Sequence, residues 1–236
     1  MTKIEAIQKL MEDNGGAASW VFIYNNIEKY YPSAKSSRNW RAGLRGVLYR
    51  EIGKGFKKIG LGIYALSDYK EEPKEKIISN PIRMHSYMQG ICIELGNIDG
   101  FHTFSADPTA PFKDNISLGE LTAMKAIPNF TYSEIVKAAS KIDVLWFNTT
   151  GFQFPKRAIE IVDSIGTLGE AFTRTYQLLD FDTEFYIIGK EKDKANFDKR
   201  RQLAPYNRIA RRFVYRSYDE IISVYESKLR IKEIGF

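Results

Sequence analysis

Two apolar segments, 142–148 (IDVLWFN) and 154–164 (FPKRAIEIVDS), decide how the rest of this chain is interpreted. Both are rich in residues that favour β-strands, and each is short enough to form a single strand. Each contains one acid within its apolar run, Asp143 in the first and Glu160 in the second. A carboxylate in an apolar strand is costly unless it is paired or binds a metal. The two acids therefore predict a shared site on neighbouring strands.

Carboxylate oxygens are the ligands that Mg²⁺ and Mn²⁺ prefer. We therefore expect Asp143 and Glu160 to hold Mg²⁺, or Mn²⁺ in its place, which would polarise a phosphodiester and help to deprotonate water. Glu160 and Val162 share one face of a strand, and Asp163 points away from it. A β-bulge could turn Asp163 inward as a third ligand.

Further segments extend the pattern, namely 95–108 (LGNIDGFHTFSADP), 158–178 (AIEIVDSIGTLGEAFTRTYQL) and 203–221 (LAPYNRIARRFVYRSYDEI). With the strand around Asp143, their order resembles bacterial restriction-endonuclease-like proteins of the PD-(D/E)xK superfamily, over about residues 83–225. The resemblance implies a mixed-sheet nuclease domain that cleaves double-stranded DNA with the help of Mg²⁺.

The chain departs from the superfamily pattern at three places. Val162 stands where the superfamily has Lys, and Ile142 stands where it has Pro. The resemblance also implies an acid near Tyr87, a position that this chain does not fill with one. These departures keep a second interpretation open, in which the protein has the nuclease fold but does not catalyse cleavage.

Other side chains could replace the missing cation. Lys141 precedes Asp143 by two residues, and Lys156 lies on the strand face of Glu160. Gln177, on the helix that follows, is a further polar candidate for the catalytic site, and His85 opens a helix near it.

The first seventy residues predict a separate DNA-binding unit. Apolar residues at helical spacing indicate helices over 3–14, 18–30 and 38–52, and glycines punctuate a β-hairpin over 53–66. Three helices followed by a hairpin are the plan of a winged helix, whose third helix enters the major groove of DNA.

Basic residues favour the same interpretation. Residues 1–69 carry 11 Lys and Arg against 6 Asp and Glu, and residues 190–236 carry 13 against 7, whereas the middle of the chain is acidic. Basic ends around an acidic centre are typical of a protein that binds phosphate and holds metal. We expect the DNA contacts to come from Arg38, Asn39, Arg41, Arg45, Lys54, Lys57 and Lys58, and from Arg208, Arg211 and Arg212 near the C-terminus.

The whole chain is therefore expected to be an α/β protein with a winged-helix domain over 1–69, a linker over 70–81 and an endonuclease-like domain over 82–236. In the second domain the pattern predicts helices over 83–95, 131–140, 167–179 and 218–229, a loop over 106–118, and strands over 101–105, 142–147, 157–162, 184–188 and 212–215.

Composition limits the alternatives. One cysteine, Cys92, excludes an internal disulfide and a cysteine-based zinc site, and the N-terminus has no apolar signal core, so we expect a cytoplasmic protein. The function expected is sequence-specific restriction of duplex DNA, with a DNA methyltransferase as its functional partner and a homodimer favoured by the need to cut two strands. The alternatives are a DNA-binding regulator without catalysis and a nuclease that acts on modified or structured DNA.

Overall fold

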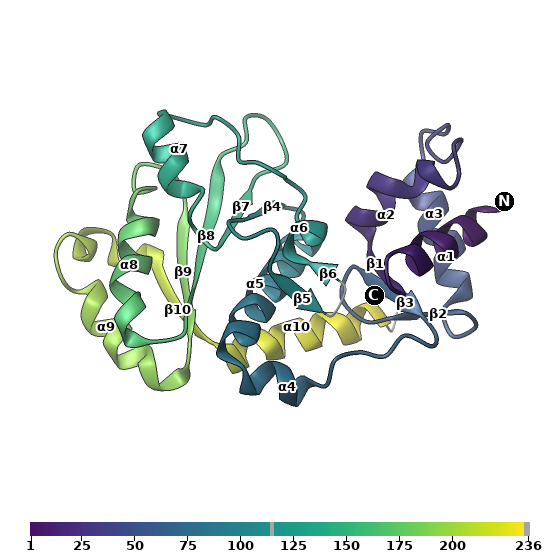
Figure 1. Cartoon of the computed structure of the whole chain (residues 1–236). Helices are drawn as coiled ribbons and strands as arrows, with labels where there is room; N and C mark the ends of the chain where they lie inside the picture. The colour runs from purple at the N-terminus through teal and green to yellow at the C-terminus, as the bar shows by residue number, and fades with distance from the viewer. Residues whose placement is uncertain (114–115, 234–236) are drawn as a thin grey trace.

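The structure is a computed structural model that describes residues 1–113 and 116–233, and it has the expected mixed α/β composition (Figure 1). An N-terminal unit of helices and a small sheet lies beside a larger unit built on a five-stranded sheet. No helix in the described residues has both the length and the apolar character needed to cross a membrane.

The N-terminal unit contains the three expected helices and the expected hairpin. Its elements are α1 (Lys3–Asp13), β1 (Ala17–Ser19), α2 (Trp20–Asn26), α3 (Trp40–Glu51), β2 (Phe56–Lys58) and β3 (Ile63–Leu66). The hairpin gains a third strand, because β1 pairs antiparallel with β3 on the side away from β2. Helix α3 is shorter than predicted, so that Arg38 and Asn39 precede it.

The larger unit has a sheet with strand order β10-β9-β8-β7-β4. Strands β8, β9 and β10 run parallel, whereas β7 is antiparallel to both β8 and β4, which confirms the predicted mixed sheet. The strands are β4 (His102–Ser105), β7 (Val144–Phe147), β8 (Pro155–Val162), β9 (Glu184–Gly189) and β10 (Phe213–Ser217).

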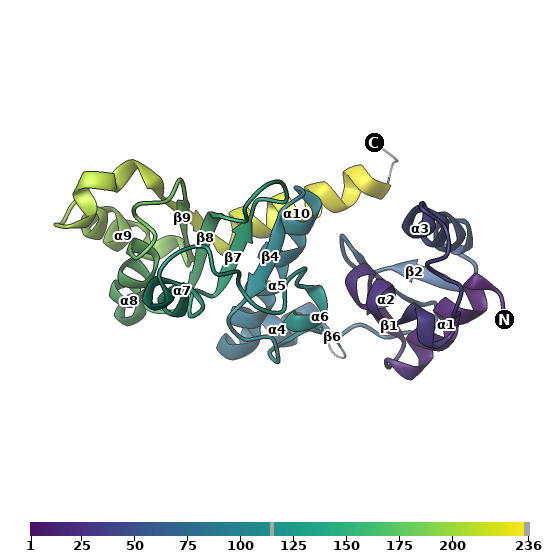
Figure 2. The ribbon, with the colours of Figure 1, turned by 90° about the horizontal axis from the view of Figure 1, so that it is seen from above.

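Helices cover both faces of this sheet, and the side chains of β8 alternate between them. Ala158 and Val162 pack toward α8 (Ile165–Tyr176), whereas Ile159 and Ile161 pack toward α5 (Pro81–Ile98). Figures 1 and 2 show α8 with α9 (Lys194–Arg201) on one side and α5 with α10 (Tyr218–Glu233) on the other. The sheet is buried on both faces, which explains its continuous apolar runs.

Several predicted stretches differ from the structure. The linker over 70–81 contains a helix, α4 (Lys74–Ser79), and α5 begins at Pro81, two residues before its predicted start. The predicted loop over 106–118 contains short elements, which are β5 (Pro111–Lys113), β6 (Ile116–Ser117) and the start of α6 (Leu118–Leu121). Helices α7 (Ser133–Ala139) and α9 complete the fold, and α9 was not predicted. These elements were missed because they are too short to carry a clear period.

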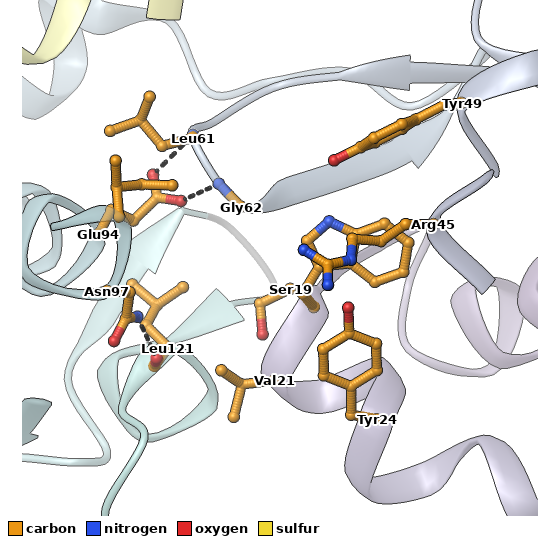
Figure 3. Close-up of a pocket in the computed structure, with 12 residues that line it drawn as sticks. Ser19, Val21, Tyr24, Arg45, Tyr49, Leu61, Gly62, Glu94, Asn97 and Leu121 are labelled. Carbon is orange, nitrogen blue, oxygen red and sulfur yellow. Dashed lines mark hydrogen bonds between the residues drawn. The ribbon is translucent and has the colours of Figure 1, made fainter. Parts of the chain in front are cut away.

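The turn of the hairpin, residues 59–62, docks against the larger unit. The carboxylate of Glu94 on α5 accepts the backbone N–H of Leu61 at 3.2 Å and of Gly62 at 2.6 Å (Figure 3), and it also accepts the hydroxyl of Tyr225 from α10. A Cβ added to Gly60 would lie 2.8 Å from Glu94 Oε2, so a residue without a side chain is required for this approach.

One apolar cluster continues across this contact. Ile59, Leu61 and Ile63 of the hairpin are buried in the same cluster as Ile91 of α5 and Tyr225 of α10. The tip of the predicted wing, residues 59–62, is therefore part of the protein interior. The two units share a core instead of being joined by a linker alone.

Replacing Glu94 should destabilise the whole protein. We expect Glu94→Ala to lower the free energy of unfolding by about 3 kcal/mol or more, because each buried donor left without an acceptor costs about 1–3 kcal/mol. Glu94→Gln keeps one acceptor oxygen and should fall between Ala and wild type in urea unfolding. Glu134→Ala, an exposed change on α7, is the control. Equal unfolding midpoints for wild type and Glu94→Ala would contradict this role of the carboxylate.

Candidate functional site

The two strand-borne acids lie at the same end of the sheet. Val144 pairs with Ile159 in the antiparallel register of β7 and β8, so Asp143 and Glu160 are opposite each other one step further along. Asp143 directly precedes β7 instead of lying within it. Its Oδ2 atom accepts the backbone N–H of Ile161 at 2.7 Å, which fixes the side chain against β8.

Glu160 is completely buried, and an arginine neutralises it. Arg174 on α8 donates from Nε to Oε1 at 2.7 Å and from Nη2 to Oε2 at 2.6 Å. This bidentate geometry is the strongest form of a carboxylate–guanidinium pair. Burial raises the pKa of Glu160 above its usual value, and Arg174 opposes that rise. Both oxygens of Glu160 are therefore engaged within the protein.

His85 on α5 lies between the other two acids. Its Nδ1 atom is 2.7 Å from Asp163 Oδ2, and its Nε2 atom is 3.6 Å from Asp143 Oδ2. The side-chain amide of Gln89, one turn further along α5, lies 3.1 Å from Nε2. Tyr218, the first residue of α10, donates its hydroxyl to Asp163 Oδ1 at 2.8 Å.

The surroundings of His85 favour its charged form. Burial acts to lower the pKa of the ring, but the contacts with Asp143 and Asp163 outweigh burial and raise the pKa to about 10. Burial acts to raise the pKa of Asp163, but the bonds from His85 and Tyr218 outweigh it and lower the pKa. At neutral pH the ring of His85 is therefore an imidazolium, and it pairs with the carboxylate of Asp163.

A cleft of about 280 Å³ leads from this cluster to the surface, and Asp163, Lys190 and Tyr218 line it together with α4 and α5 residues. Lys190 directly follows β9 and is exposed. The cluster is therefore reachable from solvent on the side of Asp163, while Glu160 is not.

The structure does not bring the other predicted catalytic residues to the cluster. Lys156 lies at the opposite end of β8 from Glu160, and its Nζ atom pairs with Asp182 at 2.7 Å. Gln177 is exposed after the end of α8 and donates to the carbonyl of Thr173 at 3.3 Å. Lys141 is exposed, whereas Arg174 and His85 contact the acids directly. The expectation that a lysine supplies the missing cation is wrong for Lys156.

These residues do not fit a metal ion as they are arranged. Both oxygens of Glu160 bind Arg174, and both oxygens of Asp163 bind His85 and Tyr218. Within residues 1–113 and 116–233, no group of three or more His, Cys, Asp and Glu is arranged to hold a metal ion. To bind these carboxylate oxygens, Mg²⁺ would have to displace Arg174 and His85.

The predicted DNA-binding residues of the third helix are on the surface. Arg38, Arg41 and Arg45 are exposed, and within the described part of the chain no acidic side chain pairs with any of them. The Arg41 guanidinium lies over the rings of Tyr24 at 5.3 Å and Trp40 at 5.2 Å, which holds it at the surface. Asn39, also exposed, makes no side-chain bond to the start of α3.

The hairpin lysines are more constrained than expected. Lys57 donates from Nζ to the carbonyl of Tyr69, and Lys58 is half-buried. Lys54 is exposed and lies 3.6 Å from Glu51. Of these three lysines, Lys54 is the most exposed.

The C-terminal arginines divide into two kinds. Arg208 and Arg211 are exposed on a short 3₁₀ segment. Arg212 instead donates to the carbonyl oxygens of Leu178, Leu179, Phe181 and Thr183, which lie between α8 and β9. The guanidinium of Arg212 thus holds a loop of the protein, and its contact with DNA stays a prediction.

Two functional neighbours of the acids were not assigned from the sequence. A buried Glu160 requires a cation. Arg174 is the only basic residue of α8, the helix that directly follows the strand of Glu160, so this helix offered one candidate for that cation. Tyr218 offered no such signal, because its contact depends on how α10 returns to the sheet.

Comparisons of this chain with protein-family models, with curated proteins and with solved structures found no match.

The charge of His85 predicts a specific pH dependence. Its folded-state pKa is about 10, above the ordinary value of 6.5, so its contribution to stability is complete below about pH 6.5 and is lost as the pH rises through about 10. We expect His85→Ala to lose about 1.5–3 kcal/mol of unfolding free energy at pH 6, the usual contribution of a hydrogen bond to a charged group. The deficit relative to wild type should shrink toward pH 10 in urea titrations.

The second histidine of the chain provides a matched control. His102 contacts Gln153 and lies away from the three acids. His102→Ala should keep the pH dependence of wild type. A deficit of His85→Ala that stays constant from pH 6 to pH 10 would contradict a charged imidazole.

Proposed function

We propose that this protein binds double-stranded DNA as a regulator, without hydrolysing it. The observation that carries the proposal is the group of exposed arginines at the third helix, with Arg38 just before α3 and Arg41 and Arg45 on it, none of which has an acidic partner among the described residues. The spacing of four residues puts Arg41 and Arg45 on one side of the helix. Unpaired guanidinium groups suit phosphate oxygens and guanine edges.

The order of elements in the N-terminal unit supports a winged-helix assignment. Helix α1, strand β1, helices α2 and α3, and the hairpin of β2 and β3 follow one another in the sequence that this fold requires. The third helix of such a domain enters the major groove. Because the tip of the hairpin is buried against Glu94, α3 and Lys54 remain as the DNA-binding surface, and recognition depends on the helix more than on the wing.

The larger unit supports the resemblance to restriction-endonuclease-like proteins. A helix, three antiparallel strands, a second helix and a parallel strand follow in order as α5, β4, β7, β8, α8 and β9. The acids that a nuclease would use for metal are instead neutralised by Arg174 and His85. A domain with this shape and these ion pairs can bind DNA and keep its fold without a metal.

The second candidate is the sequence-specific endonuclease, which one observation favours. Asp143 and Glu160 are opposite each other on adjacent strands, the relationship that the D…(D/E)-x-K pattern requires. For Mg²⁺ to enter, Arg174 and His85 would have to leave the carboxylates, which costs the energy of both sets of contacts.

DNA binding is tested by removing single guanidinium groups. We expect Arg38→Ala and Arg41→Ala each to weaken binding to a pool of random duplexes and to reduce the slope of log affinity against log salt by about 1, the effect of one lost phosphate contact. Fluorescence anisotropy at several salt concentrations measures both. Lys137→Ala, an exposed cation on α7, should leave affinity and slope unchanged. Equal slopes for all variants would contradict the proposed surface.

Metal binding and cleavage separate the two candidates. We expect millimolar Mg²⁺ or Mn²⁺ to leave the melting temperature unchanged, whereas an ion at 100 times its Kd would stabilise the fold by about 2.7 kcal/mol. We also expect plasmid DNA to stay intact with either ion. Cleavage by wild type that Asp143→Ala abolishes would establish the endonuclease in place of the regulator.

A further inference from the structure

A cavity of about 180 Å³ lies between the N-terminal unit and the larger unit, away from the acids described above (Figure 3). One side is formed by α2 and α3, and the other by α5, the end of α6 and the hairpin turn. In Figure 3, Arg45 lies between Tyr24 and Tyr49, with Glu94, Asn97 and Leu121 on the opposite side.

Aromatic rings form the wall on the side of α2 and α3. The rings of Trp20 and Tyr24 stack at a centroid distance of 5.3 Å, and Tyr49 meets Trp20 edge-on at 6.2 Å. Tyr49 keeps 47% of its surface exposed, so part of its ring is open to a ligand. Aromatic faces that border an open cavity suit a planar ring as ligand.

The charges around the cavity favour an anion at its mouth. The carboxylate of Glu94 already accepts hydrogen bonds from the N–H groups of Leu61 and Gly62 and from the hydroxyl of Tyr225. The side chain of Asn97 donates to the carbonyl of Leu121 and accepts from the hydroxyl of Thr103. Arg45 is exposed and has no acidic partner within the described residues, so the charge that remains available to a ligand is positive.

The volume limits the size of the ring system. Sites for drug-sized ligands measure about 300–1,000 Å³, so a cavity of about 180 Å³ fits a single ring system with its substituent outside. Arg45 also belongs to the group of arginines that faces DNA in the proposed function, which places the cavity beside the bound duplex.

We propose that this cavity binds one unstacked nucleobase, and that Arg45 holds the phosphate attached to it. The inference rests on the proposed DNA binding if the base comes from a bound duplex, and a free mononucleotide offers the same chemistry. Extrusion of a base is easiest where it is unpaired, and the base then stacks on aromatic side chains.

The first arm of the test compares two duplexes that differ only by one unpaired nucleotide. We expect wild type to bind the bulged duplex about tenfold more tightly than the matched duplex, within the range of one stacked base. Tyr49→Leu should lose the preference and still bind the matched duplex, whereas Tyr49→Phe, which keeps the ring, should retain it. Thermal unfolding checks that the fold of each variant is intact.

The second arm uses deoxyadenosine monophosphate and deoxyadenosine, with quenching of tryptophan fluorescence as the readout. We expect the monophosphate to bind more tightly than the nucleoside, and Arg45→Gln to remove that difference. Mononucleotide binding that depends on Tyr49, without a preference for the bulge, identifies a free nucleotide as the ligand.

The outcomes separate the cavity from the proposed function. No bulge preference and no Tyr49-dependent quenching, with normal binding of the matched duplex, overturns the cavity site and leaves DNA binding in place. Tyr49-dependent quenching in a protein that binds no duplex supports the cavity site and overturns the DNA-binding function. Absence of both kinds of binding overturns both.

Discussion

The buried carboxylate of Glu94 joins three parts of the chain that are distant in sequence. It receives two backbone N–H groups from the hairpin turn and a hydroxyl from α10, while its own helix lies against the central sheet. Burial raises the pKa of Glu94, and the surrounding donors oppose that rise. Because this contact holds the hairpin against α5, it also sets the distance between α3 and the larger unit. The orientation of the basic helix and the width of the cavity beside Arg45 both depend on it.

The same principle governs the acids at the end of the sheet. Glu160, Asp143 and Asp163 would repel one another if they were left alone, but Glu160 pairs with Arg174, and Asp143 and Asp163 both lie against His85. Arg174 approaches from α8 and His85 from α5, so the two layers that cover the sheet are electrostatically joined through its carboxylates. The ion pairs of this acidic cluster thus connect the two layers of helices through the sheet.

The sequence predicted those helices and strands whose apolar pattern lies within one continuous segment and extends over several residues. The apolar runs around Val144 and Ile159 identified β7 and β8, and helical spacing identified α1 and α3 within a few residues. It did not predict β1, because Ala17–Ser19 has no strand-forming side chain and becomes a strand only by pairing with β3. The acids were predicted as one site, but their partners were not. Arg174 lies 14 residues from Glu160, and its contact follows from packing that no local pattern encodes.

The position of Tyr225 has a consequence for how the protein is made. During synthesis from the N-terminus, the hairpin and α5 leave the ribosome long before α10, so Glu94 can meet Leu61 and Gly62 while its third donor is still missing. The nascent chain therefore carries a carboxylate that lacks one of its three donors, beside an exposed apolar turn, until α10 has been synthesised. A chain that stops before α10 would keep this surface open, which makes truncated products natural substrates for chaperones and proteases.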